Sequence, residues 1–183
     1  MNNKKVQFIT RTAAILAITV VFQLLRVIIP GLGALPSSVY IIGSLVNLGL
    51  LLGVSIVGIS GGLIIACITP IIALLTAHIM NPYQLVLVAA GNVSLVLVYG
   101  LLSKHILLFK NKIVSNSISV VVGALIKFAV MYFGATLVAK MLLSNADFQK
   151  VFALAQTFQL ITALIGGALM LLIMPALKKA IKI

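Results

Sequence analysis

The chain has 183 residues, of which 63% are hydrophobic and 8% are charged, and its formal net charge is +12. A soluble domain carries roughly 25% charged residues, so the composition excludes a soluble domain and indicates an integral membrane protein with a single domain, residues 1–183. The cations lie at the ends of apolar segments rather than along one basic stripe, so the net charge indicates no nucleic-acid partner.

Six apolar segments are candidates for membrane spans, which need about 20 mostly apolar residues each. They predict an all-α integral membrane protein, a compact bundle of six transmembrane helices in the lipid bilayer. Only glycine-punctuated sequence, Gly53 to Gly58, separates the second segment from the third, so this boundary is the least defined. The six segments are 9–29, 39–54, 58–79, 83–103, 115–139 and 155–177.

The distribution of cations predicts the orientation of the bundle. With six spans, one side of the membrane carries nine lysines and arginines, and the other carries Lys140 and Lys150, with Arg26 near the end of the first span. The positive-inside rule places the richer side in the cytoplasm. Both termini lie on that side, so we expect cytoplasmic N- and C-termini. The nine residues are Lys4, Lys5, Arg11, Lys104, Lys110, Lys112, Lys178, Lys179 and Lys182.

Lys127 lies in the middle of the fifth segment, in "GALIKFAVMYFG". It is about 12 residues, or ~18 Å, from either end of the span, and a mid-helix lysine costs roughly 2.5 to 3.5 kcal/mol to insert. The single acidic residue of the chain, Asp147, lies outside every span. Three interpretations follow: a neutral amine bonded to carbonyls, a lysine facing a wet cavity, or a lysine that binds an anionic or acceptor-rich ligand.

Five further polar residues are predicted to lie with this lysine in the outer half of the membrane. Each has a structural alternative, such as a hydrogen bond between helices or a side chain that snorkels to the interface. Their convergence predicts a binding pocket that opens to the outside. The five are Asn92, Gln84, Gln159, Tyr40 and Arg26.

Three further stretches carry a resemblance to a known family. Ala13 and Ala17 form a small-xxx-small pair in the first segment, "PGLGALPSS" follows that segment, and "VGISGGLIIACITP" opens the third. Together with the length, the six spans and the basic ends, they resemble the substrate-binding (S) component of an energy-coupling factor (ECF) transporter. The resemblance covers nearly the whole chain.

The resemblance implies a function in vitamin uptake at a bacterial plasma membrane. Members of this family capture a vitamin or vitamin precursor from outside with high affinity and associate with a transmembrane coupling (T) subunit and two cytoplasmic ATPases. Ala13 and Ala17 would contact the coupling subunit, and ATP hydrolysis would make the S component topple and release its ligand inside. An anionic vitamin such as pantothenate is one candidate ligand, and pyridoxine, hydroxymethylpyrimidine and cobalamin stay open.

Three other classes of function are weighed against this interpretation. A purely structural or assembly membrane protein is one of them, and it predicts that Lys127 and Asn92 tolerate substitution without loss of ligand binding. An enzyme would need paired acids, a metal cluster or an activated nucleophile, and one aspartate, two histidines and one cysteine do not supply them. We therefore expect no catalytic residue, no metal and no cofactor. The phosphate-binding motif G-x-x-x-x-G-K-[ST] is absent, so ATP hydrolysis is expected in partner subunits. The alternative function is a stand-alone channel or secondary transporter, although such carriers usually show intramembrane carboxylates.

Overall fold

The structure, a computed structural model, describes residues 3–29, 31–32, 35, 37–76, 82–105, 112–142 and 156–181. Within these residues the chain forms six helices and no strand, as the all-α prediction requires. The helices are α1 (Asn3–Ile28), α2 (Ser38–Val57), α3 (Ile59–Leu75), α4 (Pro82–His105), α5 (Lys112–Leu142) and α7 (Thr157–Ile181).

Five of the six helices are long and apolar enough to cross a membrane. The exception is α3, whose 17 residues span ~26 Å at 1.5 Å per residue, compared with about 30 Å for the hydrocarbon core of a bilayer. The predicted third span continued to residue 79, but residues 77–79 lie outside the described part of the chain. The described helices therefore agree with a multi-pass membrane protein.

The turn between α2 and α3 consists of one residue, Gly58, so the predicted end of the second span at residue 54 is too early. Gly53 lies inside α2, where it allows close packing instead of breaking the helix. Gly58 has φ 104° and ψ 179°, a conformation that is essentially restricted to glycine. Its N–H donates to the Val54 carbonyl (2.9 Å) and its own carbonyl accepts from the Gly62 N–H (3.1 Å), which closes both helix ends.

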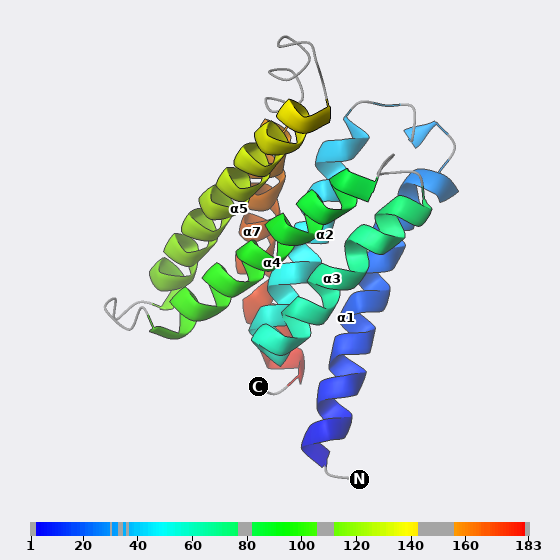
Figure 1. Ribbon diagram of the computed structural model, residues 1–183. Helices are drawn as coiled ribbons and strands as arrows, with labels where there is room; N and C mark the ends of the chain where they lie inside the picture. Colours follow the sequence, from blue (N-terminus) through cyan, green and yellow to red (C-terminus); the bar gives the residue numbers. More distant parts are fainter. Residues whose placement is uncertain are drawn as a thin grey trace.

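The helices run alternately up and down, so that α1 begins and α7 ends at the same end of the bundle (Figure 1). We call this the basic end, because Lys4, Lys5 and Arg11 of α1 and Lys178 and Lys179 of α7 lie there, and we call the opposite end, where Arg26 of α1 lies, the far end. α2 contacts α1, α3, α4 and α7, and it is the most buried of the five long helices, while α1 is the least. That the basic end faces the cytoplasm stays a prediction.

The hydrophobic core fills the half of the bundle next to the basic end. Leu50, Leu51, Ile65, Leu95 and Val96 are inaccessible to solvent there. Glycines bring the helix backbones together: a Cβ atom on Gly62 of α3 would lie 2.5 Å from Val54 Cγ2, and one on Gly100 of α4 would lie 2.5 Å from Ile59 Cγ1. An added methyl group would force its neighbours to shift at these contacts, so the helices pack closely in this half of the bundle.

Candidate functional site

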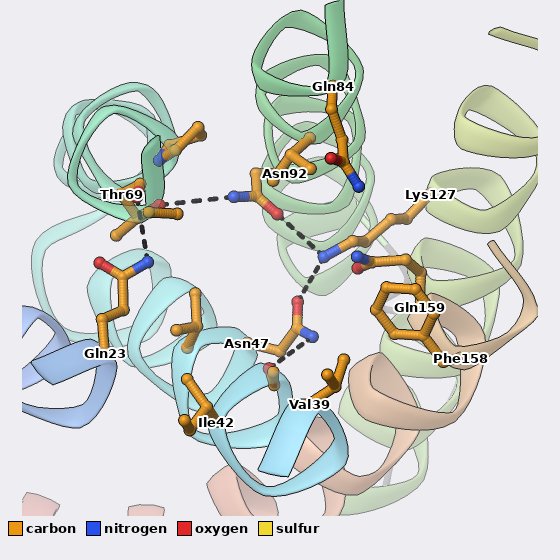
Figure 2. Close-up of a pocket in the computed structure, with 15 residues that line it drawn as sticks. Gln23, Val39, Ile42, Asn47, Thr69, Gln84, Asn92, Lys127, Phe158 and Gln159 are labelled. Atoms are coloured by element: carbon orange, nitrogen blue, oxygen red, sulfur yellow. Dashed lines mark hydrogen bonds between the residues drawn. The ribbon is translucent and has the colours of Figure 1, made fainter. Parts of the chain in front are cut away.

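A cavity of about 250 Å³ lies in the far half of the bundle, above the hydrophobic core. Every described helix contributes to its wall, and polar side chains from α2, α4 and α5 meet at its floor (Figure 2). The lining residues are Gln23, Val39, Ile42, Gly43, Val46, Asn47, Thr69, Pro70, Ala73, Gln84, Val88, Asn92, Lys127, Phe158 and Gln159.

Lys127 is the centre of this polar floor. Its side chain is 2% exposed, although it is the longest in the cavity wall. Its Nζ donates to Asn47 Oδ1 at 2.7 Å and to Asn92 Oδ1 at 2.9 Å. Both partners are neutral amides, and the chain's single carboxylate side chain, Asp147, lies outside the described residues. The lysine is thus held by dipoles instead of by an opposite charge.

The hydrogen bond from Lys127 fixes the orientation of the Asn92 side-chain amide. A lysine ammonium only donates, so Asn92 must present its oxygen to Lys127 and its nitrogen to Thr69 Oγ1, 3.4 Å away. The Thr69 carbonyl in turn accepts from Gln23 Nε2 at 3.0 Å. A hydrogen-bonded chain therefore joins α5 to α4, α3 and α1. At its end, Gln23 Oε1 is buried and has no hydrogen-bond partner in the described part of the protein.

A second chain of hydrogen bonds leaves Lys127 through Asn47 of α2. Asn47 Nδ2 donates to the Gly43 carbonyl (2.9 Å) and to Thr162 Oγ1 of α7 (3.2 Å). The Thr162 hydroxyl donates to the Gln159 carbonyl (3.2 Å). Gly166 permits this contact between α2 and α7, because a Cβ atom there would lie 2.6 Å from the Ser44 carbonyl oxygen.

The structure brings four of the six predicted binding residues together. Lys127, Asn92, Gln84 and Gln159 line the cavity, and the first two are bonded to each other. Lys127 is bonded to side-chain carbonyls and also lines a cavity, so the structure shows the contacts that two of the three interpretations require, and its charge state stays a prediction. Whether it contacts a ligand stays a prediction.

The other two predicted binding residues do not line the cavity. Tyr40 is 43% exposed, because its neighbours Val39 and Ile42 occupy the face of α2 that turns inward. Arg26 is half-buried near the end of α1, one turn beyond Gln23, whose side chain takes the place at the cavity wall.

Three residues of the network that line the cavity were not among the predicted binding residues: Asn47, Thr69 and Gln23. Asn47 had a clear signal, since it is an amide in the middle of an apolar span, as Asn92 is. Gln23 had a weaker one, because a glutamine near a helix end is often at the membrane interface. Thr69 had none, since threonine is ordinary in membrane helices and usually bonds to its own backbone.

The site offers binding chemistry: hydrogen-bond donors, amide dipoles and one lysine at the floor of a partly apolar cavity. Among the described residues no group of three metal-ligating side chains occurs. The fold and the site together define a helical bundle with five helices that could cross a membrane and with a partly polar cavity in one half. Comparison with known proteins finds no family model, no curated protein and no solved structure that matches this chain.

Proposed function

We propose that this protein is the substrate-binding (S) component of an ECF-type transporter, which captures a vitamin or vitamin precursor for ATP-driven uptake by partner subunits. The observation that carries the proposal is Lys127: a buried cation that lines a cavity and has no acidic partner in any span. An ionisable group in the membrane interior is costly and usually functional. An anionic vitamin such as pantothenate would supply the missing partner.

The position of the cavity supports capture from one side. The cavity occupies the far half of the bundle, and a closely packed hydrophobic core lies between it and the basic end. By the positive-inside rule the far end faces the outside. A protein of this shape can bind a solute from outside without offering it a continuous path across the membrane. A channel needs such a path, whereas a binding component does not.

The exposure of α1 supports the proposed partners, a transmembrane coupling subunit and two ATPases. α1 is buried along one stripe, at Thr12, Ile15, Thr19 and Gln23. Ala13 and the second alanine of the pair, Ala17, lie on its exposed side. Small residues allow another helix to approach closely within a membrane. This face is therefore available for the coupling subunit.

Two measurements on the same preparation test the proposal. Affinity purification of the tagged chain from its native membrane should recover a coupling subunit and two ATPases, and Ala17→Trp should remove all three because the indole blocks close approach. Liposomes that contain the chain alone should then show ligand binding without net uptake. Uptake by the chain alone would establish the alternative, a stand-alone channel or secondary transporter.

A further inference from the structure

We propose that the cavity selects small molecules with a single carboxylate on a compact, largely apolar body, and that it rejects phosphate esters and cations. This inference rests on the proposed binding function and specifies the chemistry of the ligand. It follows from three properties of the cavity: its charge, its free hydrogen-bond donors and its size.

The first property is that one cation lines the cavity. Among the described lining residues Lys127 is the only charged one. It can neutralise one negative charge. A phosphate monoester carries about −1.5 to −2 at neutral pH, so its second charge would be buried without a partner, which is strongly unfavourable. A single carboxylate carries one negative charge, which Lys127 neutralises, so no unpaired charge is buried.

The second property is the number of donors that remain for a ligand. A lysine ammonium has three N–H groups, and two of them are directed to Asn47 and Asn92. The third is left for the cavity. Figure 2 shows the Gln159 side chain reaching toward the same point, and its amide has no hydrogen-bond partner among the described residues. The third Lys127 N–H and an N–H of the Gln159 amide can donate to the two oxygens of one carboxylate.

The same arrangement excludes cationic ligands. The oxygens of Asn47 and Asn92 already accept from Lys127, so a ligand ammonium would have to bond to glutamine oxygens of the wall, such as Gln23 Oε1. A positive ligand would also lie next to the lysine charge in a medium of low dielectric constant, where repulsion is strong. The floor of the cavity is therefore set for an acceptor.

The third property is the size and surface of the remaining wall. The volume of about 250 Å³ is just below the usual range of ~300–1,000 Å³ for ligand sites, so a macrocycle such as cobalamin does not fit. Phe158 is the one aromatic residue among the described lining residues, which gives little surface for ring stacking. The aliphatic side chains of the wall are those of Val39, Ile42, Val46, Ala73 and Val88.

The test is mass spectrometry of the small molecules that co-purify with the full chain after expression in rich medium. Wild type is compared with Lys127→Met, which removes the cation, and with Asn92→Asp, which neutralises it internally and keeps the side-chain volume. Ser117→Ala is the control, because Ser117 is on α5 but bonds only to its own helix, away from the cavity. Size-exclusion profiles establish that each variant is folded.

The expected result is a near-stoichiometric monocarboxylic acid without phosphate in wild type and Ser117→Ala. In both site variants the ligand loses a charge-assisted hydrogen bond, which should reduce the amount of co-purified acid about tenfold or more. A bound phosphate ester, cation or molecule without a carboxyl group would overturn the inference and leave the binding function standing. Retention within threefold in both folded site variants would overturn the role of Lys127. A wild-type protein that is empty in every medium would overturn the proposed function and the inference with it.

Discussion

Replacing either asparagine beside Lys127 with aspartate gives two variants with the same new charge and different hydrogen bonding. In Asn92→Asp, one carboxylate oxygen keeps the position 2.9 Å from Lys127 Nζ, and the other faces Thr69 Oγ1 at 3.4 Å. A threonine hydroxyl can donate as well as accept. Thr69 can therefore turn its proton to the carboxylate, and every hydrogen bond of the original side chain has a replacement.

Asn47→Asp has no such replacement. Its second oxygen would stand where Nδ2 donates to the Gly43 carbonyl (2.9 Å) and to Thr162 Oγ1 (3.2 Å). The Gly43 carbonyl cannot donate, and the Thr162 hydroxyl already donates to the Gln159 carbonyl (3.2 Å). The variant loses two hydrogen bonds and places two oxygens against each other.

Comparing the two variants with each other removes the electrostatic energy of the new carboxylate from the result. The ion-pair energy with Lys127 and the cost of burying a carboxylate are similar in both, so they largely cancel in the difference. What remains is two hydrogen bonds at about 1 kcal/mol each. Asn47→Asp should therefore be roughly 2 kcal/mol less stable than Asn92→Asp, which lowers the melting temperature by roughly 4–8 °C for a chain of this length.

Thermal unfolding in detergent micelles, followed by circular dichroism at 222 nm, measures this difference. Asn116→Asp is the control for adding a carboxylate, since Asn116 is near the start of α5, away from the cavity. Equal melting temperatures for the two site variants, or a higher one for Asn47→Asp, would refute the orientation of the amides around Lys127.

The other predictions concern the backbone and the end of the network. Gly58→Ala should destabilise the fold by about 1–3 kcal/mol, because its backbone conformation is restricted to glycine; the exposed Ser60→Ala, two residues on, should melt within a degree or two of wild type. Gly166→Ala should cost about 1–3 kcal/mol through overpacking of α7 against α2, and an unchanged melting temperature would contradict that close approach. Gln23→Met should change the free energy of unfolding by less than about 1 kcal/mol, because one polar atom of Gln23, its Oε1, is already buried without a partner in the described part of the chain. A large loss of stability in the same unfolding assay would show that a hydrogen-bond donor outside the described residues binds Oε1.

The sequence predicted the helices well, because apolar segments of about 20 residues have few alternatives in a membrane. It placed the end of α2 too early, since Gly53 and Gly58 look alike in the sequence. One is a packing contact within a helix, and the other is the turn itself. Which role a glycine takes depends on its neighbours in space, and those are set by the packing of α2 against α3 and α4.

The site was predictable in its centre and less so at its edges. A lysine in the middle of an apolar span needs polar surroundings under each of its three interpretations, and Asn92, which lies at a comparable depth, is one of its partners. Tyr40 and Arg26 failed to reach the cavity because a helix turns by 100° per residue, so a shift of one position changes the face on which a side chain lies. The bond between Lys127 and Asn47 joins residues 80 positions apart. Depth in the membrane can suggest such a pair, but only the packing of the helices shows that the two side chains meet.

The contacts without room for a methyl group, at Gly62 and Gly100, have a consequence for how a solute could leave the protein. At both contacts the atoms nearest to the missing methyl group belong to side chains of a neighbouring helix, so small local displacements have little free space in which to occur. Under the proposed function, release of a solute toward the basic end would require these packed helices to move. Such a movement takes place within the bilayer, so its rate would depend on the surrounding lipid as well as on the sequence.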